Sequence, residues 1–319
     1  MSPLATASVG SPALWAGFLG FVLLMLGLDL GVFHRRAHEV SLREAALWSA
    51  LWVALSFVFA AGVWWQFGSE RALEFTTGYL IEKALSVDNI FVFVVVFGAF
   101  GIPALYQHRV LFWGILGALA MRAAFIFAGT ALLQRFHWTI YIFGGLLLLT
   151  GLRLLGTRNQ ESHPERNPVI RLAQRTIPVS AGLAGGRFFV REGGRRLATP
   201  LFLALLAVEV TDLIFAVDSI PAIFAVTRDP FIVFTSNIFA ILGLRSLYFL
   251  LAGIVSRFRY LKTGLALVLV FVGLKMVLAD VYKIPIAASL GVVAALIGGA
   301  VALSLRAAPR PVEAPRGTP

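Results

Sequence analysis

Three carboxylates lie inside one apolar stretch of this sequence. The segment AVEVTDLIFAVDSIPAIF, residues 207–224, places Glu209, Asp212 and Asp218 among side chains that dissolve in lipid. A carboxylate at the centre of a bilayer costs about 2.5–3.5 kcal/mol even on the lenient insertion scale. Carboxylates kept in such a place bind cations, carry protons or pair with buried bases. The segment therefore predicts ion chemistry within a membrane.

A second segment repeats this pattern. EKALSVDNIF holds Glu82 and Asp88 six residues apart, and DLIFAVDSIP holds Asp212 and Asp218 at the same spacing. Basic residues follow both segments in the same order: Arg122 in LAMRAAFIFAG and Arg153 in TGLRLL, then Arg245 in LGLRSLYFLLAG and Lys275 in VGLKMVL. The matching positions are offset by 130, 123 and 122 residues. Three matches in one order indicate an internal repeat.

The composition predicts the elements that carry these residues. Of the 319 residues, 59% are hydrophobic and only 13% are charged, whereas a soluble domain has roughly 25% charged residues. Runs of about 20 apolar residues cross a bilayer core as helices. Nine such runs occur, at about 13–33, 45–67, 76–100, 110–133, 139–155, 200–225, 231–254, 261–281 and 285–305. We predict an all-α polytopic membrane protein with about nine transmembrane helices, the first of which stays as an anchor.

Basic residues predict the orientation. Of the 27 Lys and Arg residues, 19 lie in or beside the connections after runs 1, 3, 5 and 7 and in the C-terminal tail. Only four follow the other runs. The positive-inside rule then places the N-terminus outside and the C-terminus in the cytoplasm. The two triplets of runs start on opposite sides, so the repeat is inverted, which is a recurring architecture of transporters. The net charge of +11 follows from this topology, and we expect no nucleic-acid partner.

Five regions follow from these patterns. They are residues 1–75 with the first two runs, 76–155 with the first repeat, 156–199 as an Arg-rich cytoplasmic loop, 200–281 with the second, inverted repeat, and 282–319 with the ninth run and a disordered tail. The loop contains a hairpin signal at Glu192-Gly193-Gly194. We interpret it as a linker held near anionic headgroups by its arginines, or as a docking segment. Ser41-Leu-Arg-Glu44 predicts a capping box that opens the second run.

Pro221 suggests how the acids of the sixth run could share one cavity. On a regular helix Asp212 and Asp218 lie about 120° apart, so the three carboxylates of this run would fan around it. Proline removes a backbone donor and disfavours helix at the residue before it. We therefore expect the helix to break near residues 218–220 and line a cavity. By the repeat, Asp88 and Asp218 would then face each other across the pseudo-twofold axis.

The charge balance within the runs selects a cation as ligand. The runs hold seven acids (Asp29, Glu82, Asp88, Glu209, Asp212, Asp218 and Asp280) and four bases (Lys83, Arg122, Arg245 and Lys275). Pairing every base leaves three acids, which must be protonated, solvated or balanced by a bound cation. The chain has no cysteine and no histidine in the middle of a run. Carboxylate, amide, hydroxyl and carbonyl oxygens suit Mn²⁺, Mg²⁺ or Ca²⁺ better than Zn²⁺ or copper.

Simple charge pairing is the alternative for several of these residues. The four bases could lock helices together as counter-charges or relay protons, and Arg122 and Arg245 favour the first role because arginine keeps its charge. For Glu82, Lys83 and residues near the ends of runs, a packing pair is about as plausible as ligation. We expect Asp88 and Asp218 to be direct ligands, with Asp212, Glu209 and Asn237 close to them.

Two long stretches resemble a known family. EKALSVDNIFVF and VEVTDLIFAVDSIPAIFAVTRDPFIVFTSNIFAILGLRSLYFLL are similar to signature stretches of the TerC family, which includes the Alx-type proteins. The resemblance covers roughly the nine runs. It implies a bacterial inner-membrane protein linked to manganese efflux, tellurium resistance or the supply of metal to secreted enzymes. It also implies a metal site at these positions: Glu82, Asp88, Glu209, Asp212, Asp218 and Asn237.

The predicted function is export of Mn²⁺ across the inner membrane by alternating access, with inward protons as the driving ions. Mn²⁺ is then a transported substrate, and we expect no permanently bound cofactor and no enzymatic activity. The sequence has no nucleotide-binding GxxxxGK[ST] motif. Two alternatives stay open: export of another divalent cation such as Ca²⁺, and a membrane scaffold that recruits partners through the Arg-rich loop. Homo-oligomers and membrane partner proteins are compatible with either.

Overall fold

The computed structural model of the chain describes residues 8–31, 40–136, 138–156, 168–180, 182–252 and 260–307. Each of the nine predicted runs falls on a helix, and the seventh is divided between two helices, α8 and α9. The predicted disordered tail lies almost entirely outside the described residues. The elements are α1 (Pro12–Gly31), α2 (Leu42–Phe67), α3 (Ser69–Ala99), α4 (Ala104–Arg135), α5 (Thr139–Gly156), α6 (Pro168–Thr176), η2 (Ala184–Gly186), β1 (Phe189–Glu192), β2 (Arg195–Ala198), α7 (Pro200–Phe224), α8 (Pro230–Leu242), α9 (Leu244–Leu251), α10 (Leu261–Val277) and α11 (Ile286–Arg306).

The helices confirm an all-α polytopic membrane protein. Within the described residues, six helical segments are long and apolar enough to cross a membrane: α2, α4, α5, α7, the α8–α9 pair and α11. Helix α3 is 31 residues long. Its charged residues, which include Glu82, Lys83 and Asp88, make it more polar than these six segments. The predicted total of nine spans stays a prediction.

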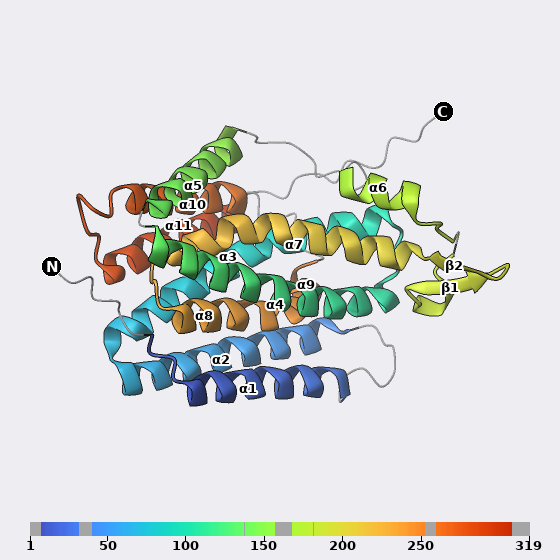
Figure 1. The fold of residues 1–319 in the computed structure, drawn as a ribbon, viewed down its shortest axis with the longest axis horizontal. Helices are drawn as coiled ribbons and strands as arrows, with labels where there is room; N and C mark the ends of the chain where they lie inside the picture. Colours follow the sequence, from blue (N-terminus) through green and yellow to red (C-terminus); the bar gives the residue numbers. More distant parts are fainter. Residues whose placement is uncertain are drawn as a thin grey trace.

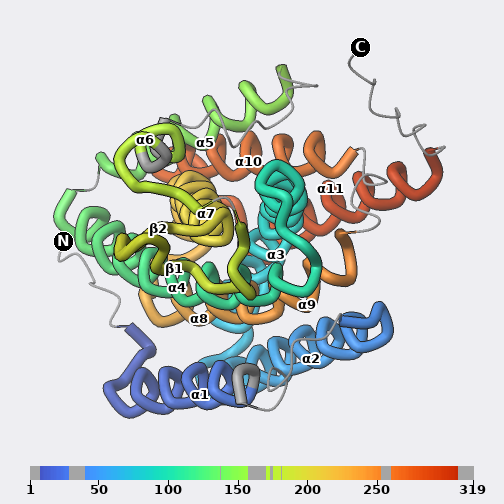
Figure 2. Tube along the Cα trace, turned by 90° about the vertical axis from the view of Figure 1, so that its right-hand side faces the viewer, coloured from blue at the N-terminus to red at the C-terminus, as the bar shows by residue number. Residues whose placement is uncertain are grey.

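Helices α3 and α7 form the centre of the bundle. Figure 2, which looks along the bundle from the end that carries β1 and β2, shows these two helices side by side. Helices α1 and α2 lie on one side of the bundle, and α5, α10 and α11 lie on the other (Figures 1 and 2). Helix α4 packs on α7 while α8 packs on α3. The polar segments of both repeats therefore meet in the interior of the molecule.

The two central helices run in opposite directions. Asn89 of α3 reaches Asp212 of α7, and a Cβ at Gly78 of α3 would lie 3.3 Å from Cγ2 of Ile223. Moving forward along α3 thus means moving backward along α7. We call the end where α3 finishes and α7 begins the hairpin end, because β1 and β2 lie there (Figure 1). The other end, where α8 begins after Asp229, is the Asp229 end.

Helices α5 and α10 also pack antiparallel, through small residues. A Cβ at Gly144 would lie 3.0 Å from the carbonyl oxygen of Gly273, and a Cβ at Gly151 would lie 2.8 Å from that of Ala266. Small residues let helix backbones approach this closely in a membrane. The two contacts exchange partners under the predicted repeat, since Gly144 matches Ala266 and Gly151 matches Gly273 at an offset of 122 residues.

Helix α7 is continuous, so the predicted break at residues 218–220 is wrong. The helix extends from Pro200 to Phe224 with Pro221 inside its last turn. Proline removes the donor for the carbonyl one turn earlier, but only the final turn is affected because the helix ends three residues later. The N–H of Ala225 donates to the carbonyl of Pro221 at 3.1 Å, which completes this turn.

Gly243 divides the seventh run into α8 and α9. A Cβ there would lie 3.0 Å from both Nζ of Lys83 and Cβ of Trp52. The absence of a side chain thus lets α2 and α3 approach the junction. This junction lies at the level of Lys83 of α3, one residue from Glu82.

Two local predictions are confirmed. Ser41 caps α2, and its hydroxyl accepts a hydrogen bond from the N–H of Glu44 at 3.3 Å. Strands β1 and β2 pair antiparallel, with Glu192 opposite Arg195, and Gly193 and Gly194 form the turn at positive φ. The hairpin projects from the bundle beyond the start of α7 (Figure 1). Short-range patterns were sufficient to predict both features.

Candidate functional site

Arg122 is the centre of a buried polar network. This residue of α4 is 1% exposed. Its Nη2 and Nε donate to the two oxygens of Asp212 on α7, at 2.9 and 3.2 Å. Its Nη1 forms an ion pair with Glu82 on α3, which is also buried. One guanidinium therefore joins the acids that the internal repeat makes equivalent.

Neutral oxygens complete the surroundings of the guanidinium. The Oγ of Ser219 on α7 and the Oδ1 of Asn237 on α8 each lie 3.4 Å from Nη1 of Arg122. The amide of Asn237 also donates to Oε2 of Glu82 at 3.1 Å. Three helices thus direct only oxygen atoms toward one end of this cation. Carboxylate, amide and hydroxyl oxygens are also the ligands of hard divalent cations.

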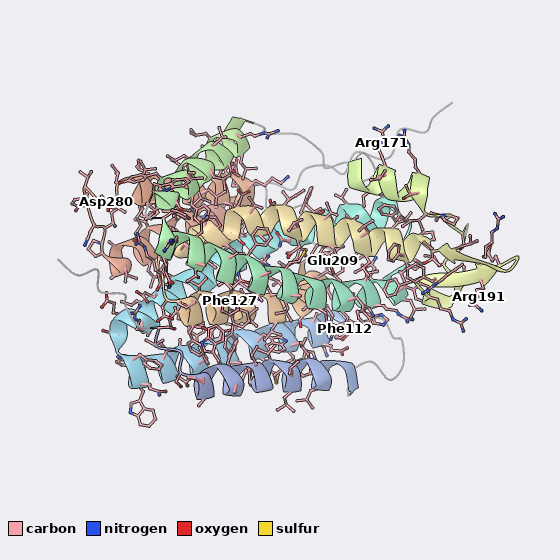
Figure 3. The ribbon with its side chains drawn as sticks, viewed as in Figure 1. Phe112, Phe127, Arg171, Arg191, Glu209 and Asp280 are labelled. Carbon is pink, nitrogen blue, oxygen red and sulfur yellow. The ribbon has the colours of Figure 1, made fainter. Side chains whose placement is uncertain are left out.

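With both acids ionised, the network would carry one negative charge in excess. Two carboxylates face a single guanidinium, and arginine remains charged in proteins. Separating such a pair would leave a buried charge without compensation, which is strongly unfavourable. Figure 3 labels Glu209, on the same helix as Asp212, in the middle of the bundle and far from both of its ends. The network therefore holds charge at depth rather than at the surface.

Two buried oxygens beside the network have no hydrogen-bond partner among the described residues. They are Oγ of Ser86 and Oδ1 of Asn89, and both residues are at most 1% exposed. The Nδ2 of Asn89 reaches Oδ1 of Asp212 only at 3.5 Å. Buried polar atoms are nearly always paired in native proteins. Both oxygens lie on α3, toward the hairpin end from Glu82.

Asp88 and Asp218, which we predicted to face each other, have separate partners. Asp218 accepts a hydrogen bond from Oγ1 of Thr150 on α5 at 3.0 Å. Asp88 lies within electrostatic range of Lys262 on α10, and Lys262 also covers the ring of Phe91 at 4.5 Å. Among the described residues no hydrogen bond or electrostatic contact joins the two carboxylates. Because helix α7 is unbroken, Asp218 stays on the side of α7 that faces α5, away from Arg122.

Glu209 approaches the network without joining its hydrogen bonds. Its carboxylate lies directly against Gly117 of α4, where a Cβ would collide with it. It is half-buried and interacts electrostatically with Asp212, one turn further along α7. Of the six predicted metal-site residues, the structure brings together Glu82, Asp212 and Asn237. It places Glu209 near Asp212, and it places Asp88 and Asp218 against α10 and α5.

The remaining predicted bases contact neutral groups or lie further out. Lys83 donates to the carbonyl of Ala240 at 3.3 Å, and Lys275 donates to Oγ of Ser289 at 2.9 Å. Arg245, the repeat equivalent of Arg122, is half-buried on α9. Within the described part of the chain, no three His, Asp or Glu side chains are close enough to hold a metal ion without rearrangement.

The sequence analysis missed a second polar cluster, at the Asp229 end. Glu74 of α3 accepts hydrogen bonds from Arg71 and from Thr227, both at 2.8 Å. Asp229 caps α8 and also accepts from the hydroxyl of Ser8 and the N–H of Val9, at 3.0 and 2.8 Å. The Arg71–Glu74 spacing and Asp229 before Pro230 were visible signals. Their meeting at one end depends on tertiary packing.

The chain is similar to a family and to several curated proteins. Residues 67–311 match the family described as "Integral membrane protein TerC family". An uncharacterized membrane protein of Myxococcus xanthus, STKORF319, is 65% identical over 298 residues, which cover 93% of each chain. The "Putative membrane-bound redox modulator Alx" of Escherichia coli K12 is 50% identical over 295 residues, 90% of this chain and 92% of the relative. No solved structure matches the chain.

Proposed function

The chain belongs to the TerC family of integral membrane proteins, and from this premise we propose that it exports a divalent metal cation, Mn²⁺, across the bacterial inner membrane by alternating access. The observation that carries the proposal is the position of the Arg122 guanidinium. A permanent cation occupies an all-oxygen cage formed by Glu82, Asp212, Ser219 and Asn237. A metal cation could take its place.

Competition between Arg122 and the cargo is the proposed binding mechanism. In the structure the guanidinium neutralises Glu82 and Asp212. An arriving cation would draw both carboxylates toward itself and release Arg122 from one or both of them. The cage supplies oxygen donors only, which suit Mn²⁺, Mg²⁺ and Ca²⁺. The same geometry disfavours an anion, because two acids face the single guanidinium.

The proposed ligands differ from those expected from the sequence. Glu82 and Asp212 become the central pair, with Asn237 and Ser219 as neutral donors, because these residues already surround one cation. Asp88 and Asp218 take peripheral positions, against α10 and α5. Glu209 lies against Gly117 and within electrostatic range of Asp212, where it could receive a cation that leaves or approaches the cage.

The arrangement of helices supports an inverted repeat. The contacts of α4 with α7 and of α3 with α8 exchange when the two triplets are exchanged, as do those of α5 with α7 and of α10 with α3. The antiparallel pairs α3–α7 and α5–α10 are what a twofold axis in the membrane plane would produce. Transporters built in this way carry their site near the midplane, at the interface of the repeats.

Export against a negative-inside potential needs a driving force. Moving two positive charges outward costs about 4.6 kcal/mol at 100 mV. We propose that inward protons, taken up by the carboxylates as the metal leaves, supply it. The same groups then serve both ions, so the two cannot occupy the cage together.

A scaffold that recruits partners is the competing hypothesis. The exposed arginines of α6 and of the hairpin, which include Arg171 and Arg191 (Figure 3), favour some role for this region. The name of the Escherichia coli relative suggests redox modulation. No residue of the present chain is a cysteine, so its own thiol chemistry cannot supply such an effect. An effect on cellular redox state would then follow indirectly from metal export.

Metal flux in inverted membrane vesicles tests the proposal. We expect Mn²⁺ uptake by wild-type vesicles and at least about tenfold less with Glu82→Gln or Asp212→Asn, because even groups behind a metal ligand are worth about 10–100-fold. Asp88→Asn and Asp218→Asn are matched controls that lie off the cage, and we expect smaller losses. If only Asp88→Asn and Asp218→Asn reduce Mn²⁺ uptake, the metal site lies at the positions predicted from the sequence. Absence of wild-type flux under an imposed proton gradient would refute transport and favour the scaffold.

A further inference from the structure

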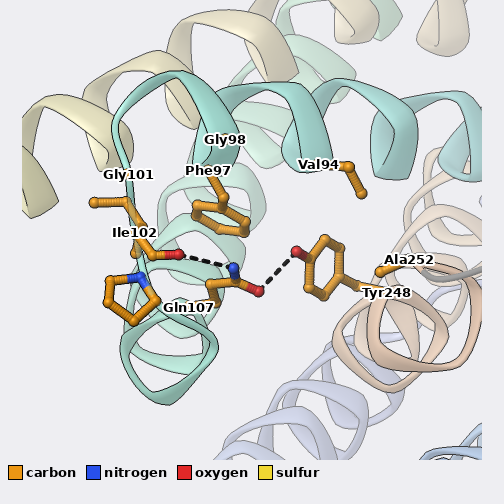
Figure 4. A pocket seen from close by; sticks show the side chains of 9 residues that line it. Val94, Phe97, Gly98, Gly101, Ile102, Gln107, Tyr248 and Ala252 are labelled. Atoms are coloured by element: carbon orange, nitrogen blue, oxygen red, sulfur yellow. Dashed lines mark hydrogen bonds between the residues drawn. The ribbon is translucent and has the colours of Figure 1, made fainter. Parts of the chain in front are cut away.

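A cavity of about 530 Å³ that is wide open to the surface lies at the hairpin end, between the end of α3, the beginning of α4 and the end of α9. Its walls include Val94, Phe97, Gln107, Tyr248 and Ala252 (Figure 4). The hydroxyl of Tyr248 donates to Oε1 of Gln107 at 2.8 Å, while the amide of Gln107 donates to the carbonyl of Ile102 at 2.9 Å. The rings of Phe97 and Tyr248 meet edge to face, with centroids 5.5 Å apart.

One face of α3 connects this cavity with the polar network. Glu82, Ser86, Asn89, Phe93 and Phe97 are spaced four, three, four and four residues apart, which places them in one stripe along a helix. The stripe begins at a carboxylate of the cage and ends at the cavity wall. Between them lie the two unpartnered buried oxygens of Ser86 and Asn89. The oxygens of Ser86 and Asn89 lie between the cage and two buried phenylalanines, Phe93 and Phe97.

The equivalent place at the Asp229 end is filled. Val94 and Ala252 of the cavity wall correspond to Phe224 and Gly129, at offsets of 130 and 123 residues. The ring of Phe224 occupies the space over Gly129, where a Cβ would lie 2.6 Å from its Cε2. This ring also stacks on Phe143, with centroids 6.2 Å apart. The two repeats thus place a cavity at one end and an aromatic plug at the other.

We propose that the cavity is the vestibule through which a hydrated divalent cation reaches the cage, and that Phe93 and Phe97 form the gate between them. This inference rests on the function proposed above and adds the route and the gate. Apolar constrictions gate ion pathways by excluding water. Tyr248 holds the gate shut through its edge-to-face contact with Phe97, and Gln107 holds Tyr248. Ser86 and Asn89 would provide the first neutral oxygens beyond the gate.

The natural absence of cysteine makes the route measurable in the full chain. Ser86→Cys replaces an unpartnered hydroxyl by a thiol of similar size, and Ala216→Cys is its control, because Ala216 is the equivalent buried position of α7. Each would be exposed to a charged, membrane-impermeant methanethiosulfonate on either face of sealed vesicles. By the distribution of arginines, the hairpin end faces the cytoplasm.

We expect the reagent to modify Ser86→Cys from the cytoplasmic face and to leave Ala216→Cys unmodified from that face. Adding Phe97→Ala should accelerate modification of Ser86→Cys about tenfold, equivalent to about 1.4 kcal/mol in the opening equilibrium, and should not affect Ala216→Cys. Mn²⁺ in the bath should slow the reaction. Val94→Cys, on the cavity wall, should react from the cytoplasmic face in every background, and it tests the vestibule even where Ser86→Cys does not fold.

Three results would overturn the inference. They are modification of Ser86→Cys from the opposite face, a rate that Phe97→Ala leaves unchanged, and an unreactive Val94→Cys. The proposed function fails separately, because it is measured as Mn²⁺ flux in the wild type. Labelling as expected without any flux would keep a gated route and reject manganese export.

Discussion

The two ends of the bundle are built from equivalent parts of an apparent repeat, yet they are closed in different ways. At the Asp229 end, Phe224 fills the space above Gly129, Glu74 binds Arg71 and Thr227, and Asp229 holds the segment at Ser8. At the hairpin end, the corresponding space is a cavity open to the surface, in which Tyr248 donates a hydrogen bond to Gln107. The Asp229 end is closed by charge and by an aromatic ring, whereas the hairpin end keeps an open space above a buried apolar cluster that includes Phe93, Phe97 and Tyr248.

This difference indicates which end is ready to open. Opening the Asp229 end would separate a buried carboxylate from two donors and expose the ring of Phe224, whereas opening the hairpin end would start beside an existing space. In an inverted repeat the two halves exchange these roles during transport. Under the proposed function, and with the orientation that the arginines predict, this structure would correspond to a state sealed toward the outside and occluded toward the cytoplasm.

The largest effect is expected at the centre that both ends share. Arg122→Gln would leave Glu82 and Asp212 buried without their cation, and breaking a buried ion pair in this way costs about 3–5 kcal/mol. We expect this loss in the free energy of unfolding, measured by SDS titration in mixed micelles. The matched variant Arg245→Gln, at the half-buried equivalent position, should lose less.

Equal losses of unfolding free energy in the two arginine variants would show that Arg122 contributes no more to stability than Arg245. The two halves of the repeat would then not differ at this position. If adding Glu82→Gln to Arg122→Gln partly restores the free energy of unfolding, the loss in Arg122→Gln comes from its unpaired carboxylates. That double variant leaves one buried carboxylate in place of two, so it reads the repulsion between Glu82 and Asp212 directly.

A smaller effect is expected where charge seals the Asp229 end. Glu74→Gln removes the negative charge that Arg71 and Thr227 bind, and hydrogen bonds to charged groups contribute about 1.5–3 kcal/mol. We expect a loss of that size in unfolding free energy and new labelling of Ala216→Cys from the outside. Glu70→Gln, one turn away and exposed, is the control and should change stability by less than about 0.5 kcal/mol. Ala216→Cys that stays unreactive in Glu74→Gln would show that packing alone seals this end.

Much of this architecture could be predicted from the sequence because its causes are local. Apolar length located the helices, Ser41 and Glu44 located a cap, and Gly193-Gly194 located the hairpin turn. The acids that share the cage could not be selected in this way. Glu82 and Asp88 lie about 120° apart around α3, so a rotation of this helix exchanges their surroundings. That rotation is set by contacts with distant parts of the chain, such as Gly78 of α3 against Ser236 and Ile223.

Pro221 is a second case in which the local sequence pattern was not sufficient to predict the structure. Its local preference for ending a helix was correctly recognised, but its effect depends on how many turns follow. With the chain leaving the helix at Phe224, the proline disturbs one hydrogen bond rather than opening a cavity. The position of a helix end relative to a proline is decided by the next packed element, here the α8 cap at Asp229.

The smallest effects should come from two glycines that test the difference between the ends most directly. A Cβ at Gly129 would lie 2.6 Å from the ring of Phe224, whereas a Cβ at Gly98, on the cavity wall, would meet nothing within 4 Å. Overpacking costs about 1–3 kcal/mol, while alanine in an unobstructed helix gains up to about 1 kcal/mol over glycine. Gly129→Ala should therefore lower the SDS midpoint, and Gly98→Ala should leave it unchanged or raise it. If Gly129→Ala is tolerated as well as Gly98→Ala, Phe224 is free to move, and the Asp229 end is no more firmly sealed than the hairpin end.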